Sequence, residues 1–205
     1  MENRVIYLVR HGKIQLEDDQ RRYIGQIDLP LAQVGRQQAR AMRQRFGGAE
    51  LGAVVCSDLG RARETAEIIA EGSGLAVAAR PDLREVSMGE WEGLTFREVA
   101  HRFPEAYQAR GKDIAQFRVA GGESFADCGR RAVAAFEDLF RSTTGNLLVV
   151  GHAGVNRLLL CHVLGMPVEH LFRLGQDYAC LNIIQGGSSG FQVRLVNGSG
   201  RASRR

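Results

Sequence analysis

Three apolar runs, each followed by polar residues, constrain the fold of this chain more than any other feature. Residues 5–9, 54–56 and 147–150 are apolar without alternation, as expected of strands covered on both faces. Such strands belong to parallel sheets that carry helices on either side. The runs therefore predict an α/β protein with a mainly parallel central sheet.

Amphipathic stretches separate these runs. Their apolar spacing predicts four helices, over residues 36–46, 61–70, 124–140 and 155–164. Weaker strand patterns follow at residues 76–79 and, as a hairpin around a glycine- and serine-rich turn, at 179–184 and 191–196. The alternation of strands and helices predicts a three-layer α/β/α sandwich.

The rest of the chain contains two long stretches and a terminal segment. We expect residues 13–34 and 87–123 to be irregular and to form the walls or lid of a site. With no break in composition, residues 1–197 are expected to form a single domain. Residues 198–205, Gly-Ser-Gly-Arg-Ala-Ser-Arg-Arg, are predicted to be a disordered basic tail.

Charge and composition exclude several classes of function. The net charge is +4, and three arginines of the terminal segment supply most of it. We find no basic stripe with interleaved aromatic residues, so no nucleic-acid partner is expected. No apolar run approaches the roughly 18 residues of a membrane span, and the chain begins without an apolar leader. We therefore expect a cytoplasmic protein that has no membrane partner.

Polar residues follow the three apolar runs, as Arg10-His11-Gly12, Ser57-Asp58-Leu59-Gly60-Arg61 and Gly151-His152-Ala153-Gly154. Sites in open α/β sheets form at the carboxyl ends of the strands, where helix N-termini also point. We therefore expect His11, Arg61 and His152 to lie close together. Composition alone predicts about 0.07 chance occurrences of the first tripeptide, so its position after a strand is what gives it weight.

These residue types suit phosphoryl transfer. An imidazole attacks phosphorus only when neutral, and with an ordinary pKa near 6.5 about three-quarters of histidines are neutral at pH 7. His11 is therefore the candidate nucleophile. Arg10, Arg61 and His152 can hold the oxygens of a bound phosphoryl group, because guanidinium groups match phosphate in charge and geometry. Positioning and charge stabilisation are most of what in-line transfer needs.

Glu85 is the candidate for the proton transfer. It follows the strand predicted at residues 76–79, so it is expected near the same sheet edge, as acid in the first step and base in the second. No carboxylate cluster of magnesium type is visible, and the four cysteines show no paired spacing. We expect neither metal nor cofactor. Alone, each of these residues is more often structural, and it is their joint occurrence at successive strand ends that favours a site.

Four segments resemble the motifs of the histidine phosphatase superfamily, which includes the cofactor-dependent phosphoglycerate mutases. They are residues 8–12, 57–66, 83–85 with 89–93, and 151–154, in the order of the family. The resemblance implies a phosphoglycerate mutase-like fold and phosphorylation of His11. It further implies that Arg10, Arg61 and His152 bind the phosphoryl group, that Glu85 is the proton donor and that phosphatase members use no cofactor.

Within the family, residues 22–31 and 121–124 are most similar to α-ribazole phosphatases of cobalamin biosynthesis. Mutases typically continue the first motif with an acidic residue and, a little later, an asparagine, whereas residues 13–17 here are Lys-Ile-Gln-Leu-Glu. The middle segment is also shorter than in mutases. Both differences favour the phosphatase branch.

The leading hypothesis is a phosphomonoesterase that acts on a small sugar- or nucleoside-type phosphate, with α-ribazole 5′-phosphate as one candidate. Mutase-type phosphoryl transfer and a non-catalytic phosphate-binding or interaction module are the alternatives. Substrate contacts are expected from Arg10, Gly12, Gly25, Gln26, Arg61 and Ala153. Tyr23 and Trp91 can either stack on a substrate or pack in the core.

Overall fold

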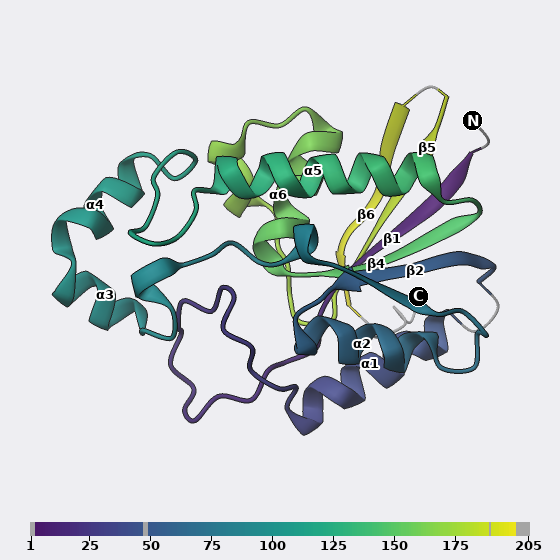
Figure 1. Cartoon of the computed structure of the whole chain (residues 1–205), viewed down its shortest axis with the longest axis horizontal. Coiled ribbons are helices and arrows are strands. Elements are labelled where there is room, and N and C mark those ends of the chain that lie inside the picture. Colours follow the sequence, from purple (N-terminus) through teal and green to yellow (C-terminus); the bar gives the residue numbers. More distant parts are fainter. Residues whose placement is uncertain (1–2, 47–48, 189, 200–205) are drawn as a thin grey trace.

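A computed structural model describes residues 3–46, 49–188 and 190–199. At its centre is a six-stranded sheet with the strand order β3-β2-β4-β1-β5-β6 (Figure 1). The strands are β1 Arg4–Arg10, β2 Leu51–Ser57, β3 Val77–Arg80, β4 Asn146–Gly151, β5 Leu181–Gly187 and β6 Gly190–Gly198. Strands β3, β2, β4 and β1 pair in parallel, whereas β5 runs antiparallel to β1 and β6 antiparallel to β5. The sheet is therefore mixed but mainly parallel, as predicted.

Helices cover both faces of this sheet (Figure 1). One face carries α1 Gln33–Arg45 and α2 Gly60–Ala70, and the other carries α5 Phe125–Ser142 and α6 Ala153–Leu164. Two short helices, α3 Phe96–Arg102 and α4 Pro104–Lys112, stand at the end of the molecule away from the β5–β6 hairpin. Three 3-10 helices complete the fold, η1 Pro81–Leu83, η2 Gly89–Trp91 and η3 Val168–Arg173. The predicted three-layer architecture is confirmed.

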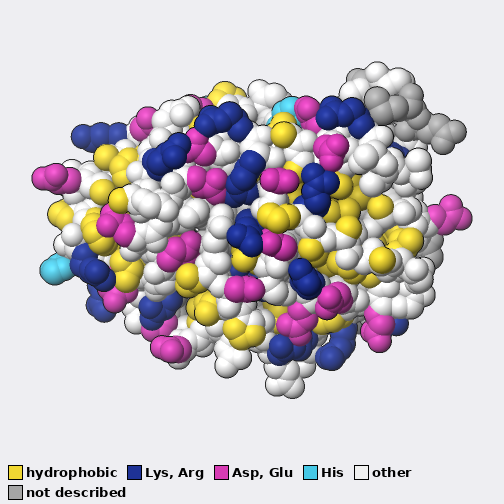
Figure 2. Space-filling model, in the orientation of Figure 1, with side chains coloured by type: hydrophobic (Ala, Val, Ile, Leu, Met, Phe, Trp, Pro, Cys, Tyr) yellow, Lys and Arg dark blue, Asp and Glu magenta, His cyan; other side chains and the backbone are white. Residues whose placement is uncertain are grey.

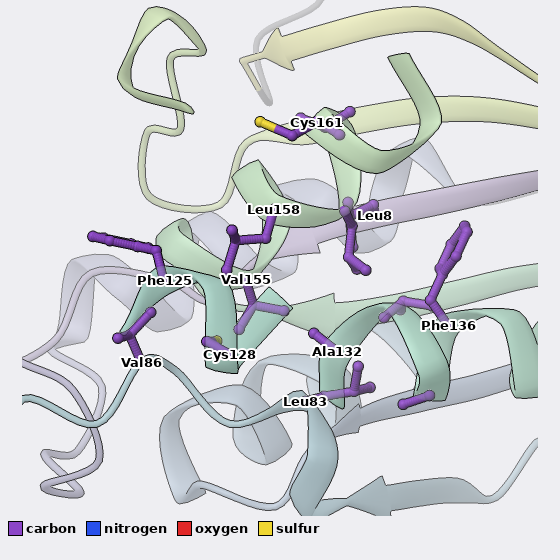
Figure 3. Close-up of a cluster of buried hydrophobic side chains, with 14 of the residues drawn as sticks. Leu8, Leu83, Val86, Phe125, Cys128, Ala132, Phe136, Val155, Leu158 and Cys161 are labelled. Carbon is purple, nitrogen blue, oxygen red and sulfur yellow. The ribbon is translucent and has the colours of Figure 1, made fainter. Parts of the chain in front are cut away.

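Successive residues of the central strands enter two separate cores. Leu8 packs with α5 and α6, and in Figure 3 it lies between Leu158 and Phe136, while Val9 packs with Met42 of α1 on the opposite face. The alternation follows from the two-residue period of a strand. Fully burying one such side chain contributes about 1.5–3 kcal/mol, so packing on both faces stabilises the sheet.

The second stretch expected to be irregular is instead partly helical. Residues 87–123 contain η2, α3 and α4. Thr95 caps α3, since its hydroxyl accepts from the Glu98 amide and the Glu98 carboxylate accepts from the Thr95 amide. α4 begins at Pro104 and buries none of its residues, so it has no apolar stripe to read from sequence. Between β1 and α1 the prediction holds, because only isolated bridges occur there.

The predicted disordered tail at residues 198–205 stays a prediction. β6 extends through Gly198, the first residue assigned to the tail, and residues 200–205 lie outside the described residues. Basic and acidic side chains are interleaved over the face seen in Figure 2 rather than gathered by sign. Within the described ranges, none of the helices combines the length and apolar character needed to cross a bilayer.

Candidate active site

The two predicted site histidines are neighbours because of the register between β1 and β4. Arg10 pairs with Gly151, and the next residue of each strand end is a histidine. The His11 amide donates to the Gly151 carbonyl at 3.1 Å, and the two imidazole centroids are 5.1 Å apart. Both rings are buried, with exposed fractions of 4% for His11 and 0% for His152. The fold thus brings the two histidine side chains together, as predicted.

A backbone contact fixes the tautomer of His11. Its Nδ1 lies 2.8 Å from the Gly12 carbonyl oxygen, which can only accept, so Nδ1 carries the hydrogen and Nε2 keeps a lone pair. Burial, reinforced by the positive charges of Arg10 and Arg61, holds the pKa of His11 well below its usual range. The ring is therefore neutral at pH 7 and nucleophilic at Nε2.

The side chain of Thr65 in α2 holds the backbone next to His11 in place. Its hydroxyl accepts from the Gly12 amide at 3.1 Å and donates to the Arg61 carbonyl at 2.7 Å. Both backbone groups of Gly12 are thus engaged within the protein, one by Thr65 and one by His11. Gly12 consequently supports the nucleophile, and its predicted substrate contact stays a prediction.

Arg61 is fully buried, with 1% of its surface exposed, although it stands in the first turn of α2. Its Nη1 donates to the Ile27 carbonyl at 2.7 Å and its Nη2 to the Gly25 carbonyl at 2.5 Å. Its Nε has no partner among the described residues. Burial lowers the pKa of Arg61, and the charge of Glu85 partly offsets that effect. Two carbonyls therefore hold the terminal nitrogens of the guanidinium, and its Nε–H is left without a partner in the part of the chain that is described.

Arg10 is held in a similar way from the segment before β5. Its Nη1 donates to the Gln176 carbonyl at 2.7 Å, and its guanidinium carbon lies 3.8 Å from the centroid of the Tyr178 ring. Its Nε is also buried without a partner in the described ranges. Arg10 therefore has a fixed orientation, with its Nε–H free to bind an anion.

His152 begins α6 as its N-cap residue, and neither ring nitrogen has a hydrogen-bond partner among the residues described. Burial, with the charges of Arg61 and Arg10 nearby, holds the pKa of His152 well below its usual range. Buried polar atoms are normally satisfied in folded proteins. Open donors on Arg10, Arg61 and His152 around one nucleophile therefore indicate a site for an anion.

Glu85 faces this site through the N-terminus of α6. Its carboxylate accepts from the Gly154 amide at 2.9 Å and from the Val155 amide at 3.2 Å. A Cβ on Gly154 would lie 2.5 Å from the Glu85 Oε1, so only glycine permits this approach. The Glu85 carbonyl in turn accepts from Gln26 and Arg131. The predicted proton carrier is thus buried and held at the N-terminus of α6, the helix that follows His152.

Glu92 organises the loop that holds Arg61, and sequence reasoning assigned it no role. Its carboxylate accepts amide hydrogens from the loop at 2.7–3.4 Å and from Met88, the residue before η2, at 3.0 Å. A Cβ on Gly25 would stand 2.3 Å from this carboxylate, which requires glycine there. The donors are Gly25, Gln26, Ile27 and Met88. Gly25 and Gln26 are therefore bound within the protein, and their substrate contacts stay predictions.

A cavity of about 1150 Å³ opens above the site. Arg10, Glu85, Ala153 and Tyr178 line it, whereas the buried side chains of His11, Arg61 and His152 are not part of its wall. Ligand pockets of several hundred Å³ enclose molecules of drug size, so this cavity can hold a phosphate ester together with a sizeable leaving group. The predicted contact at Ala153 is compatible with its place on the wall.

The two aromatic candidates differ in their access to this cavity. Trp91 has no exposed surface and stacks near Phe117, at 5.9 Å between ring centroids, so it packs in the core. Tyr23 is also largely buried but lines the cavity. In the part of the chain that the structure describes, no group of three or more His, Cys, Asp or Glu side chains is placed to hold a metal ion.

Thr65, Glu92, Gln176 and Tyr178 were missed from sequence. Each acts by a contact with a segment distant in the chain, and none stands directly at a predicted strand end. Two of them had a signal, since Thr65 lies within the motif noted at residues 57–66 and Glu92 within that at 89–93. The contacts of these four residues can be identified only in the folded structure.

Comparison with known proteins places this geometry in a family. A "Bifunctional protein Rv2228c" of Mycobacterium tuberculosis (strain ATCC 25618 / H37Rv) is 38% identical over 200 residues, which are 95% of this chain and 54% of that protein. The chain thus spans about half the length of such curated relatives. A "Probable phosphoglycerate mutase GpmB" of Yersinia pestis (strain Pestoides F) is 36% identical over 82% of this chain and 79% of its own.

Solved structures show a similar fold. The crystal structure of the alpha-ribazole phosphatase from Shigella flexneri matches with a TM-score of 0.87 and 28% identity, over 95% of this chain and 96% of that one. The sequence model for the histidine phosphatase superfamily (branch 1) matches residues 6–199, nearly the whole described chain. The fold, the strand-end histidines and these matches agree, and the chain belongs to the histidine phosphatase superfamily, branch 1.

Proposed function

We propose that this protein hydrolyses phosphomonoesters through a phosphohistidine intermediate on Nε2 of His11. The observation that carries the proposal is a neutral, tautomer-fixed imidazole among buried cationic side chains whose Nε–H groups are open. Such a pocket binds a phosphoryl group and leaves one nucleophilic atom facing the phosphorus.

In the first step, Nε2 of His11 attacks phosphorus, and the bond to the ester oxygen breaks. Arg10, Arg61 and His152 hold the equatorial oxygens, where charge is spread in the transition state. Glu85 gives its proton to the leaving alkoxide. The hydrogen bond from Nδ1 to the Gly12 carbonyl stabilises the imidazolium that forms as the nitrogen–phosphorus bond is made.

In the second step, a water replaces the departed alcohol. Glu85 takes a proton from that water, whose oxygen attacks phosphorus, and the nitrogen–phosphorus bond breaks. Inorganic phosphate leaves and His11 returns to its neutral form. The same carboxylate thus serves first as acid and then as base, which suits its fixed position at the start of α6.

The test replaces the nucleophile. His11→Ala and His11→Asn are each expected to lower kcat/KM on p-nitrophenyl phosphate by at least about a thousandfold. Wild-type protein should give an acid-labile, alkali-stable phosphoryl adduct that both variants lack. His101→Ala is the matched control, because His101 is exposed on α3. Full activity of His11→Ala, or failure to trap any adduct from a phosphomonoester panel, would favour a non-catalytic phosphate-binding module instead.

A mutase activity is the second candidate, supported by the relative named as a phosphoglycerate mutase. In that case the phosphohistidine returns its phosphoryl group to a second hydroxyl before water enters. Assays of 3-phosphoglycerate with and without 2,3-bisphosphoglycerate separate the two activities. Release of inorganic phosphate alone supports the phosphatase, and formation of 2-phosphoglycerate supports the mutase.

For the physiological substrate we propose α-ribazole 5′-phosphate, and with it a role in cobalamin biosynthesis. The support is the likeness to the Shigella flexneri enzyme together with a cavity large enough for a nucleoside-sized leaving group. We expect a kcat/KM at least about tenfold above that for adenosine 5′-monophosphate. Equal values for the two nucleoside phosphates would contradict this assignment and leave the phosphatase activity standing.

A further inference from the structure

We propose that Glu123 and Arg131 are positioning residues: their ion pair holds the main chain on both sides of Glu85 and so places its carboxylate for proton transfer to the leaving group. The inference rests on the proposed phosphatase function and adds to it the part of the fold that holds the proton carrier. Glu123 belongs to residues 121–124, a segment with no part in the site described above.

The main chain around Glu85 needs support from elsewhere in the fold. Residues 84–88 belong to no helix or strand, so their backbone groups lack the regular partners of such elements. The carboxylate of Glu85 is held separately, by two amides at the N-terminus of α6. Its position therefore depends as well on what fixes the main chain on either side of it.

Arg131 holds this main chain on the N-terminal side. From the second turn of α5, its Nη1 donates to the Asp82 carbonyl at 2.8 Å and its Nη2 to the Glu85 carbonyl at 3.1 Å. A planar guanidinium presents its donors in fixed directions, so one side chain sets the positions of both carbonyls. Val86 belongs to the same core cluster as Ala132 of α5 (Figure 3). The segment that carries Glu85 is thus attached to this helix.

Glu123 holds the main chain on the C-terminal side. Its Oε1 accepts from the Ser87 amide at 2.9 Å, and its own amide donates to the Ser87 carbonyl at 3.1 Å. A Cβ on Gly122 would lie 2.6 Å from that carbonyl oxygen, so the close approach requires glycine. The two segments are therefore joined two residues after Glu85.

The two residues also hold each other. The Nε of Arg131 donates to the Oε2 of Glu123 at 3.1 Å, and its Nη2 contacts the Oε1. The two side chains are only 24% and 17% exposed, and a bidentate contact between charged groups has a specific geometry. Neither residue lines the cavity. Any effect of the pair on the reaction therefore passes through Glu85.

Two other contacts of this segment constrain it less. Gln26 donates to the Glu85 carbonyl at 3.1 Å, but from the loop before α1 rather than from a helix. Arg84 pairs with Asp58 at 2.6 Å through its side chain, which is 41% exposed. Glu123 and Arg131 instead bind main-chain groups before and after the proton carrier.

The experiment compares two leaving groups. Phenethyl phosphate releases an alkoxide that must be protonated as it departs, whereas 2,4-dinitrophenyl phosphate releases a phenolate that needs no proton. The measured quantity is the alkyl-to-aryl ratio of kcat/KM, because kcat/KM includes formation of the phosphohistidine but not its hydrolysis. A pair that only stabilised the fold would act on both esters alike, and the ratio would not change.

Glu85→Gln provides the reference, because it removes the acid itself. It should lower the ratio by at least about a hundredfold. Glu123→Gln and Arg131→Gln should each lower the ratio by about ten- to a hundredfold, as expected when an acid is misplaced by about 1 Å. Arg131→Lys keeps the charge beside Glu123 and should fold, but an ammonium cannot replace the fork. It should still lower the ratio by about tenfold.

Two variants of α5 are the controls. Arg130→Gln is matched in chemistry, because Arg130 is the neighbouring arginine, pairs with Asp127 and is 71% exposed. It should leave the ratio unchanged. Leu139→Ala removes a buried side chain about 12 Å along the helix from Arg131. It should unfold at lower urea concentration and keep the wild-type ratio.

The outcomes separate the inference from the proposed function. If Glu85→Gln lowers the ratio but the substitutions at Glu123 and Arg131 do not, the inference is refuted while the phosphatase mechanism stands. A ratio that falls equally in Leu139→Ala also refutes it. If Glu85→Gln leaves the ratio unchanged, the assignment of proton transfer to Glu85 is overturned, and the inference with it. If wild-type protein cleaves neither ester, the proposed function itself is overturned.

Discussion

His11 donates its Nδ1 hydrogen to a carbonyl, and Arg10 and Arg61 each donate terminal N–H groups to carbonyls as well. In each arginine the terminal nitrogens are held and Nε is left without a partner among the described residues, while in His11 the held nitrogen is Nδ1. The site is thus oriented by main-chain acceptors, which cannot change rotamer. A phosphoryl group then meets donors that are already in place, so little reorganisation is needed on binding.

We expect Tyr178 to affect catalysis through its contact with Arg10. The stacked ring restricts the guanidinium at 3.8 Å, and such contacts contribute about 1 kcal/mol when partly buried. Tyr178→Leu should therefore lower kcat/KM on p-nitrophenyl phosphate by about five- to tenfold, mostly through KM. Tyr178→Phe keeps the ring and should stay within about twofold of wild type.

A double-mutant cycle with Arg10→Lys checks that this effect passes through Arg10. In the Arg10→Lys background, Tyr178→Leu should change kcat/KM little, because lysine lacks the planar group that stacks. Full additivity of the two substitutions would show that Tyr178 acts elsewhere, for instance on His11, whose ring centroid lies 5.7 Å from its own.

The predicted site residues and the missed ones differ in a physical way. His11, Arg61 and His152 follow strands or open helices, and these positions converge in any parallel sheet. Tyr178 and Thr65 act through contacts with segments far away in the chain, and such contacts depend on how loops close. A pattern of apolar residues carries no information about such contacts. Thr65 belongs to the noted segment 57–66, but its contact with Gly12 could be found only in the folded structure.

At the scale of elements, Glu92 joins the loop before α1 to the segment around η2, in addition to backbone bonds such as that from the Gly93 amide to the Tyr23 carbonyl. Its carboxylate accepts four amide hydrogens, three of them from residues 25–27. The carbonyls of the same loop hold Arg61. Glu92 therefore acts on the phosphoryl site through the loop, without touching the substrate.

Glu92→Gln should accordingly affect both stability and phosphate binding. Its amide group replaces an acceptor oxygen by a donor, which leaves buried amide hydrogens unpaired and should lower the free energy of unfolding by about 2 kcal/mol. Because Arg61 loses its fixed orientation, inhibition by inorganic phosphate should weaken about tenfold. Urea unfolding and phosphate inhibition measure the two effects.

Glu90→Gln is the matched control, since Glu90 is an exposed glutamate of η2, two residues before Glu92. It should change neither quantity. If the Glu92→Gln protein unfolds at lower urea concentration but keeps wild-type phosphate inhibition, the loop does not act on the phosphoryl site. That result would contradict the proposed connection through Arg61.

Elements with a buried face were predictable, and those without one were not. α5 buries seven residues, among them Phe136 and Leu139, and its apolar spacing gave its position within two residues at either end. α4 buries none of its residues, and it contains Pro104 and Gly111, which interrupt a helical sequence pattern. The signal of a helix is the face it buries, so a helix that stands off the core leaves little trace in the sequence.

At the scale of the whole molecule, the site depends on burial by both cores. His11 and His152 lie at the adjoining ends of β1 and β4, which helices cover on either face. Burial is the main reason that the pKa of each histidine is held well below its usual range. Burial thus keeps His11 neutral and nucleophilic. For the same reason, the folded protein resists protonation of His11 and His152.

This coupling predicts a loss of stability in mild acid. The unfolded imidazoles take up protons as pH falls through about 6.5, while the folded ones do not until their lower pKa values are reached, so the unfolded state binds more protons and is favoured. From pH 6.5 to 5.5 each histidine should remove about 1 kcal/mol, or about 2 kcal/mol together. Paired carboxylates such as Asp58, whose pKa is lowered by Arg84, release their contribution only at more acidic pH.

Urea unfolding between pH 7.5 and 5.5 measures this slope, and the His11→Asn, His152→Asn double variant should flatten it, because asparagine takes up no proton. Imidazole NMR provides a second measurement that does not depend on the variant: the His11 and His152 signals should not titrate across this range in the folded protein, while denatured protein titrates near pH 6.5. If the two signals titrate near 6.5 in the folded state, the rings are not held neutral by burial, and the argument for a neutral nucleophile at His11 loses its physical basis.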